Sequence, residues 1–173
     1  SLGTVPPDKF IPISESTGLI IPIGNWVIEQ ACIYLKQWQS AGFGELTMSI
    51  NLSVRQFFHQ ELISHIQRAI SENDIEPSSL MFEITESMLM ENVDETIDKL
   101  KKIKALGVLL SVDDFGTGYS SLSYLKRFPL DELKVDKSFV EGLPDDSDDV
   151  AIVSAIITVA HALNIEVMAE GVE

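Results

Sequence analysis

The feature that most constrains the fold of this chain is a regular alternation of short apolar runs with segments of helical periodicity. The apolar runs predict strands over residues 47–52, 80–85, 108–112, 132–135 and 165–169. The periodic segments predict helices over 8–16, 24–40, 59–71, 93–106 and 120–127, and a last helix that Asp148 or Asp149 caps and Asn164 ends. Strands that alternate with helices pair in parallel through crossover connections, so the sequence predicts an α/β fold.

A polar residue stands at or just past the end of each predicted strand: Asn51, Glu83, Asp113, Asp136 and Glu170. The spacings between them are 32, 30, 23 and 34 residues. A (β/α)₈ barrel uses roughly 31 residues per strand–helix unit and brings every strand end to one mouth. An open doubly wound sheet would instead collect its ligand groups near one switch point. The pattern therefore favours a TIM-like barrel.

Five predicted strands are too few to close a barrel of eight. An open five-stranded piece would leave unpaired strand edges, which natural proteins usually avoid. We therefore expect residues 1–173 to form a single domain truncated at both ends, with about two strand–helix units before it and at least one after it.

The charge of the chain limits the ligands that it can bind. Lys and Arg number 12 and Asp and Glu number 27, which gives a formal net charge of −15. Such a balance disfavours binding to a nucleic-acid duplex and polybasic contact with a membrane. An anionic substrate could then bind only through metal cations that the carboxylates recruit.

The single cysteine, Cys32, lies in an apolar helical pattern, which predicts a buried, unreactive thiol in a reducing compartment. Residues 1–8 lack the basic segment followed by an apolar core that is typical of a signal peptide, so we expect none in this sequence. The longest stretch without Asp, Glu, Lys or Arg covers 150–165, which is 16 residues and too short for a membrane span. We expect a packed helix there and a cytoplasmic location, with tethering of the whole protein to the inner membrane left open.

Asp113 and Asp114 close the third predicted strand and precede a loop that contains Gly116 and Gly118. Adjacent carboxylates at a strand end can turn toward two neighbouring cations. A carboxylate shared between metals about 3.5–4 Å apart is typical of two-metal phosphodiester hydrolases. The alternative is a plain acidic turn, which we favour less because the neighbouring strand ends repeat the same chemistry.

Glu83 interrupts an apolar strand, and the alternation of side chains directs it toward the barrel axis. A buried carboxylate needs a cation or several hydrogen-bond donors, so Glu83 is either a metal ligand or the partner of Lys134. Glu86 follows three residues later. It is either a carboxylate at a helix N-terminus or a group that orients the ligands.

The remaining strand ends add further candidates. Asn51 offers a neutral oxygen suited to Mg²⁺ or Mn²⁺, or serves only as a turn residue. Lys134 and Asp136 lie on the same face of their strand, where they can hold and deprotonate a water or form a salt bridge. Glu170, followed by Gly171, repeats the carboxylate at a strand end.

These segments together resemble a known family. The blocks FIPISESTGLIIPIG, SINLS, FEITES, DDFGTGYSSLSYLKRFPLDELKVDKSF and MAEGVE are similar, in this order, to successive blocks of the EAL family of bacterial cyclic-di-GMP phosphodiesterases. The resemblance covers essentially the whole chain, and its fourth block is the most specific. It implies a modified (β/α)₈ barrel that hydrolyses one phosphodiester bond of cyclic di-GMP, giving the linear dinucleotide pGpG, with two Mg²⁺ or Mn²⁺ ions. We expect Ca²⁺ to inhibit, because it prefers larger and looser coordination than Mg²⁺.

The resemblance also implies roles for the polar residues. Asn51, Glu83 and Asp113 would bind the first metal, Asp113 would bridge to the second, and Asp114 would bind that second ion. Asp136 would bind a metal or the nucleophilic water.

By the same resemblance, Lys134 would position the water and Glu170 would be a base or a carboxylate associated with the metals. Glu86 would hold the loop from Asp113 to Ser121 in its active arrangement.

Two segments of the family pattern, the Glu-Ala-Leu segment that names the family and a downstream Gln-Gly-Tyr segment, are absent from this sequence. We therefore expect a competent enzyme in the intact parent and weak or no activity from this piece alone. An attached sensory or GGDEF-type domain is expected in the parent. Two other functions are open: a cyclic-di-GMP receptor without activity, and an interaction or homodimer module that uses the apolar stretch 120–128.

Overall fold

The structure, a computed structural model, describes residues 3–117 and 122–172. The contacts within the chain divide it into two units, residues 1–80 and 81–173, with the boundary at the first residue of the second strand. In the described part of the chain, no helix combines the length and the apolar character that crossing a bilayer requires.

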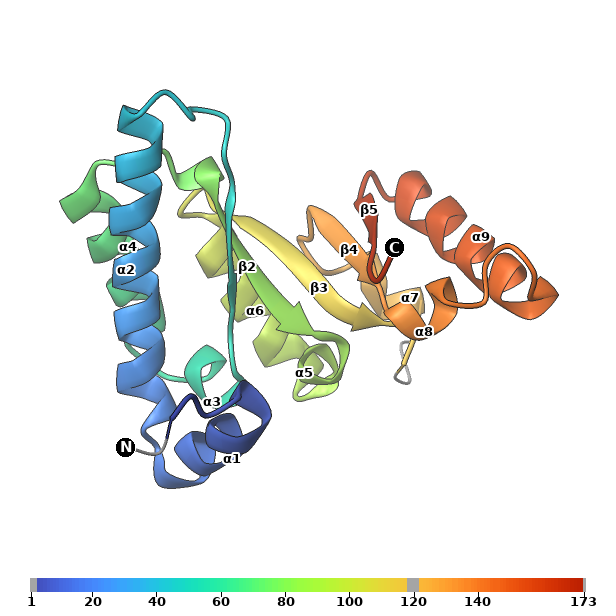
Figure 1. The fold of residues 1–173 in the computed structure, drawn as a ribbon, viewed down its shortest axis with the longest axis horizontal. Coiled ribbons are helices and arrows are strands. Elements are labelled where there is room, and N and C mark those ends of the chain that lie inside the picture. The colour runs from blue at the N-terminus through green and yellow to red at the C-terminus, as the bar shows by residue number, and fades with distance from the viewer. Residues whose placement is uncertain (1–2, 118–121, 173) are drawn as a thin grey trace. The chain divides into compact units, whose positions relative to one another are not determined.

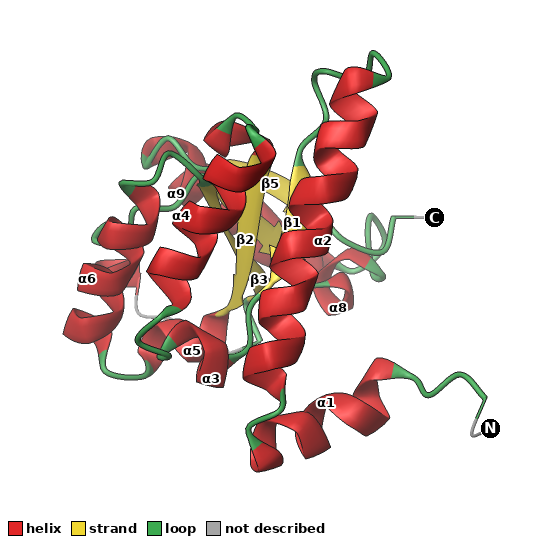
Figure 2. Ribbon diagram, turned by 90° about the vertical axis from the view of Figure 1, so that its left-hand side faces the viewer, coloured by secondary structure: helices red, strands yellow, loops and turns green. Residues whose placement is uncertain are grey.

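The first unit is mainly helical. It contains α1 (Pro7–Thr17), α2 (Ile20–Ser40), β1 (Met48–Asn51), α3 (Val54–Phe57), α4 (Leu62–Asn73) and a 3₁₀ helix (Pro77–Ser79). Helices α2 and α4 lie side by side (Figures 1 and 2). Their facing apolar side chains, among them Ile28, Leu35 and Ile66, are fully buried and form the core of this unit.

Cys32 lies in this core with no solvent exposure, as predicted. Burial, assisted by the negative charge of Glu29, raises the pKa of the Cys32 thiol to about 11. The thiolate is the reactive form of cysteine, so this side chain acts as a small apolar residue.

The second unit is an α/β unit with four parallel strands. It contains β2 (Leu80–Thr85), α5 (Glu86–Met90), α6 (Val93–Lys104), β3 (Leu109–Phe115), α7 (Leu122–Leu125), β4 (Glu132–Val135), α8 (Lys137–Val140), α9 (Ser147–Ala162) and β5 (Glu166–Ala169). Strand β2 pairs with β3, β3 with β4 and β4 with β5, all in parallel (Figure 1). This sequential order has no reversal point, which is the arrangement of a barrel rather than of a doubly wound sheet.

The strands of the second unit bury large apolar side chains, including Phe82, Leu110 and Leu133, which have no measurable exposure. At the opposite end of β3 and β4 from the predicted site, Lys104 forms an ion pair with Asp131 at 2.6 Å. The Asp131 carboxylate also accepts a hydrogen bond from the backbone N–H of Leu110 at 2.8 Å. These contacts join the N-terminal ends of the two strands.

Several predicted boundaries are wrong. Helix α2 begins at Ile20 rather than at residue 24, because proline is tolerated in the first turn of a helix and Pro22 does not stop it. The cap of α9 is Asp146, whose carboxylate accepts hydrogen bonds from the backbone of Asp148 and Asp149. The third strand, predicted to end at residue 112, continues to Phe115.

Two further predicted helices agree with the structure only in part. The helix predicted over 150–165 is only partly packed, since Val150, Ile152 and Ile157 of α9 are exposed. Of the helix predicted over 120–127, residues 122–125 are helical as α7, and residues 120 and 121 lie outside the described residues.

Candidate metal and active site

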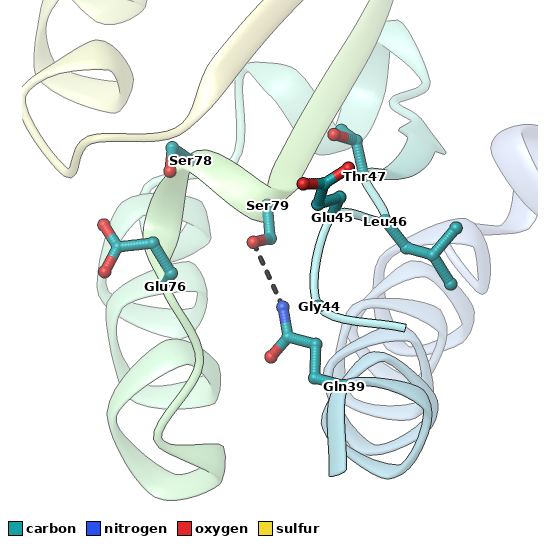
Figure 3. A pocket seen from close by; sticks show the side chains of 8 residues that line it. All are labelled: Gln39, Gly44, Glu45, Leu46, Thr47, Glu76, Ser78 and Ser79. Atoms are coloured by element: carbon teal, nitrogen blue, oxygen red, sulfur yellow. Dashed lines mark hydrogen bonds between the residues drawn. The ribbon is translucent and has the colours of Figure 1, made fainter. Parts of the chain in front are cut away.

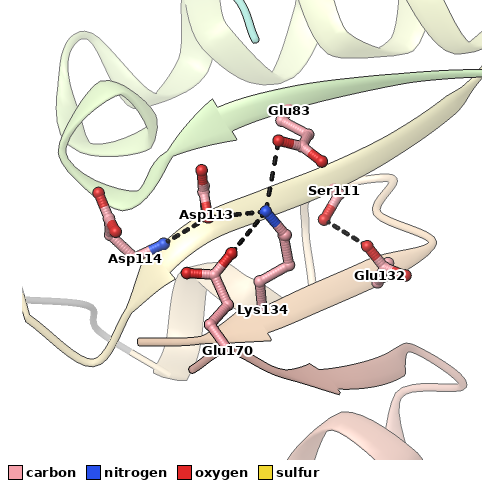
Figure 4. Close-up of polar contacts among 7 residues, drawn as sticks. All are labelled: Glu83, Ser111, Asp113, Asp114, Glu132, Lys134 and Glu170. Atoms are coloured by element: carbon pink, nitrogen blue, oxygen red, sulfur yellow. Dashed lines mark hydrogen bonds and ion pairs between the residues drawn. The ribbon is translucent and has the colours of Figure 1, made fainter. Parts of the chain in front are cut away.

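The predicted site residues of the second unit meet at the C-terminal edge of its sheet (Figure 4). Parallel strands end at the same edge, so side chains that are far apart in the sequence come together there. Glu83 extends from β2, Asp113 and Asp114 from β3, and Lys134 from β4. Glu170 follows β5 directly.

Lys134 lies at the centre of this group. Its ammonium nitrogen is 2.6 Å from a Glu170 oxygen, 3.2 Å from an Asp113 oxygen and 3.3 Å from a Glu83 oxygen. The ion pair between Glu83 and Lys134, one of the two alternatives for Glu83, is therefore present, but Lys134 divides its charge among three carboxylates. This leaves an excess of negative charge at the edge of the sheet.

The environment keeps Lys134 protonated. Its side chain is 12% exposed and that of Glu83 is 8% exposed. Burial by itself lowers the pKa of Lys134, but hydrogen bonds to Glu170 and Asp113 and the nearby charge of Glu83 outweigh it, so the pKa lies above its ordinary value. At neutral pH this residue is a cation that donates hydrogen bonds, not a base.

Asp113 and Asp114 are brought to the same edge by an irregularity in β3. The pairing with β4 is regular at Val112↔Leu133 and resumes at Phe115↔Val135, so two residues of β3 stand opposite one of β4. Asp114 has φ +56°, a left-handed conformation that aspartate tolerates better than most residues. A regular strand would direct the two carboxylates to opposite faces, and the bulge removes this separation.

Carboxylate oxygens of Asp113, Asp114 and Glu170 all lie within 4.8 Å of one another. Burial raises the pKa of the Asp114 carboxyl, and the negative charges of Asp113 and of the neighbouring carboxylates add to this effect. Oxygen atoms of carboxylates are the ligands that Mg²⁺ and Mn²⁺ prefer. The donor set therefore fits divalent cations of this class.

Asp136 joins the group from the C-terminal end of β4. Its carboxylate caps α8 by accepting hydrogen bonds from the hydroxyl and the backbone N–H of Ser138, and these bonds lower the pKa of Asp136. The negative charge of Asp136 contributes to the raised pKa of Asp114. Asp136 is thus an ionised carboxylate beside the others.

Glu86 is almost completely buried, at 2% exposure, and its carboxylate accepts a hydrogen bond from the backbone N–H of Gly116 at 2.7 Å. Gly116 has φ +105°, and a Cβ atom there would lie 2.7 Å from the ring of Phe139. Glycine is therefore required where the chain leaves β3. The contact ties α5 to the start of the loop after Asp113; residues 118–121 of that loop lie outside the described residues.

Asn51 is placed in the first unit, at the last position of β1, where it is exposed. The first unit also contains a polar hollow of about 530 Å³ in which Gln39 donates a hydrogen bond to Ser79 at 3.1 Å (Figure 3). None of the predicted site residues lines this hollow, whose walls come from the following residues: Gln39, Gly44, Glu45, Leu46, Thr47, Glu76, Ser78 and Ser79.

One polar pair close to the site, Ser111 and Glu132, is not among the predicted site residues. The hydroxyl of Ser111 donates a hydrogen bond to the carboxylate of Glu132 at 2.9 Å, and both residues are buried (Figure 4). Ser111 stands two residues before Asp113 and Glu132 two residues before Lys134. Because side chains alternate along a strand, a spacing of two residues places Ser111 on the same face as Asp113 and Glu132 on the same face as Lys134. This spacing was the available signal in the sequence that the pair lies beside the site.

Comparisons with known proteins extend the resemblance over the whole chain. The family model described as "EAL domain" matches residues 1–173. MucR of Pseudomonas aeruginosa, named a bifunctional diguanylate cyclase/cyclic di-GMP phosphodiesterase, is 46% identical over 171 residues, which are 99% of this chain and 25% of MucR. NbdA of the same organism, named a cyclic di-GMP phosphodiesterase, is 42% identical over 99% of this chain and 22% of its own length. The chain thus spans about a quarter of these relatives.

Solved structures of EAL domain proteins have the same fold as this chain. The structure titled as the PaMucR phosphodiesterase in complex with c-di-GMP superposes with a TM-score of 0.94 at 45% identity, covering 100% of this chain and 70% of that one. The manganese/cy-diGMP complex of BlrP1 from Klebsiella pneumoniae superposes with a TM-score of 0.74 at 29% identity, over 84% of this chain and 38% of that one. The α/β class with five strands and crossover helices is confirmed. The chain belongs to the EAL domain family.

Proposed function

We propose that this chain carries the metal-dependent site of a phosphodiesterase that hydrolyses one phosphodiester bond of cyclic di-GMP and releases the linear dinucleotide pGpG. The observation that carries the proposal is the convergence of three carboxylates on Lys134, with oxygens of Asp113, Asp114 and Glu170 within 4.8 Å of one another. The names of MucR and NbdA and the ligands in the titles of the related structures support the choice of substrate and metal.

The residues that would hold the ions are those of the bulge and its neighbours. Glu83 and Asp113 would bind the first ion together with Asn51, whose part rests on the family resemblance. Asp113 would bridge to the second ion, which Asp114 would also bind, and Asp136 would bind an ion or the attacking water. Two bound divalent ions would lower the pKa of that water and offset charge on the phosphoryl oxygens.

The other residues would orient the water and move its proton. Lys134 stays protonated at neutral pH, so it can donate a hydrogen bond to the water oxygen but cannot take its proton. Glu170 or Asp136 would accept that proton. The water oxygen forms a bond to phosphorus while one P–O ester bond breaks, and the leaving sugar oxygen takes up a proton. Glu86 would hold the start of the adjoining loop through Gly116.

The test is turnover of cyclic di-GMP by the full-length protein with Mg²⁺ or Mn²⁺, with pGpG separated by chromatography. We expect Asp113→Asn to reduce turnover by about 100-fold or more, because it removes the shared carboxylate. No hydrolysis by the parent, together with unchanged behaviour of Asp113→Asn, would refute the proposal. Binding of cyclic di-GMP without any product would instead identify a receptor.

A further inference from the structure

The buried pair of Ser111 and Glu132 has no place in the proposed chemistry. Ser111 has no measurable exposure and Glu132 is 7% exposed. Among the described residues, Glu132 forms no ion pair with Lys, Arg or His, and its hydrogen bond comes from a neutral hydroxyl at 2.9 Å. An apolar residue at this position would avoid the cost of burying a carboxylate. The pair therefore needs a reason other than stability.

Its position in the sheet supplies that reason. Ser111 and Glu132 are register partners, and the next pair, Val112↔Leu133, is the last regular one before the bulge. The hydrogen bond between the two side chains thus joins β3 to β4 just before the bulge, where β3 contains one residue more than β4. A change of one residue in strand register would turn the following side chains to the other face. Asp113 would then leave Lys134, from which it is now 3.2 Å distant.

We propose that the hydrogen bond between Ser111 and Glu132 is a positioning device for the metal site. It fixes the register of β3 against β4 below the bulge, and so holds Asp113 and Asp114 at the edge of the sheet. Neither Ser111 nor Glu132 touches the ions or the substrate in this proposal. The inference rests on the proposed function, since it assigns the pair to the same site.

The experiment measures Mn²⁺ affinity by electron paramagnetic resonance, and unfolding in urea, for variants of the full-length protein. Ser111→Ala and Glu132→Leu remove the bond, whereas Glu132→Gln keeps an oxygen that can accept it. We expect Mn²⁺ to bind about tenfold more weakly to the first two variants, as is typical when a group that orients metal ligands is lost. Glu132→Gln should restore affinity to within about twofold of the parent.

The matched control is Lys104→Met, which breaks the ion pair with Asp131 at the other end of the same two strands. It should lower stability while Mn²⁺ affinity stays within about twofold of the parent, which separates positioning from general destabilisation. Amide hydrogen exchange of residues 113–116 without metal gives a second readout. Exchange should be faster in Ser111→Ala and Glu132→Leu, and parent-like in Lys104→Met.

Parent-like Mn²⁺ affinity and exchange in Ser111→Ala and Glu132→Leu would overturn the inference. So would a Glu132→Gln variant as weak as Glu132→Leu, because the charge rather than the bond would then be responsible. Asp113→Asn separates the two proposals. If it leaves Mn²⁺ affinity unchanged, the proposed metal site fails. If it weakens binding while the Ser111 and Glu132 variants do not, only the positioning role fails.

Discussion

Replacement of Lys134 by methionine tests the electrostatic account of the site. Methionine keeps most of the length of the side chain but removes the ammonium group that three carboxylates share at 2.6–3.3 Å. Each such contact corresponds to an attraction of roughly 5 kcal/mol at an effective dielectric constant of about 20, which desolvation largely offsets. Removing one partner of a buried ion pair typically costs about 3–5 kcal/mol, and we expect a loss of this size at neutral pH.

The pH dependence follows from the direction of the pKa. In the folded protein the pKa of Lys134 lies above its ordinary value of 10.5, so its stabilisation is complete at neutral pH and is lost only as the pH rises through the folded value. The difference in the free energy of unfolding between parent and variant should therefore hold from neutral pH to about pH 9 and narrow only at higher pH.

The assay is urea unfolding of the full-length protein and Lys134→Met with a chelator present, so that no divalent ion replaces the ammonium. Lys137→Met is the matched control, because Lys137 is an exposed lysine three residues along the chain. Its loss should change the free energy of unfolding by no more than about 0.5 kcal/mol. A Lys134→Met variant as stable as the parent at neutral pH, or a difference that already narrows between neutral pH and about pH 9, would refute the reasoning.

Three further outcomes are expected. Ca²⁺ in place of Mg²⁺ should abolish turnover of cyclic di-GMP, and efficient turnover with Ca²⁺ alone would contradict the two-metal arrangement. Glu86→Gln should lower the free energy of unfolding by about 1–2 kcal/mol, because the hydrogen bond from the backbone N–H of Gly116 loses a charged acceptor. Amide hydrogen exchange at residues 116–117 should become faster in this variant. Unchanged exchange would contradict the role of Glu86 in holding the loop. Gly24→Ala should cost about 1–3 kcal/mol in urea unfolding, since its Cβ would lie 1.7 Å from the buried side chain of Gln56. Gly44→Ala is the control, because Gly44 lies in a turn where no atom is within 4 Å of the added Cβ, and equal losses in the two variants would show that the clash with Gln56 is not responsible.

The strands were the most predictable part of the fold. The predicted bounds of β2 and β4 agree with the structure, because in each short segment buried apolar side chains occupy alternate positions, as is typical of a strand. The short helices α3 and α8 were missed, whereas the start of α5 at Glu86 confirms one of the two interpretations of that residue, a carboxylate at a helix N-terminus. Each of the two missed helices has only four residues, too few to show a helical period, and each begins within three residues of a strand end. The cap of α3, where Ser53 accepts a bond from the backbone of Gln56, was the available signal.

The site was predictable to the level of which residues meet, but not of how they meet. Parallel strands dictate that Glu83, Asp113 and Lys134 share an edge once their strands are identified. The extra residue in β3 could not be predicted, because a left-handed aspartate at position 114 leaves no signature in the sequence beyond the residue type. The number of carboxylates that contact Lys134 could not be predicted either, since the spacing of residues in the sequence does not distinguish one ion pair from three.

The proportion of charges at this edge of the sheet has a physical rationale in the proposed function. In the described part of the chain, one ammonium group faces the carboxylates of Glu83, Asp113 and Glu170, while Asp114 and Asp136 add further negative charge beside them. A second lysine would stabilise the protein without metal, but it would also compete with divalent ions for the same oxygens. A site that must recruit metal cations has to contain fewer positively charged side chains than carboxylates. The protein without metal is less stable as a result, but its carboxylates remain free to bind the ions. Lys134 alone is enough to hold the strand ends together and leaves most of the negative charge available to the metals.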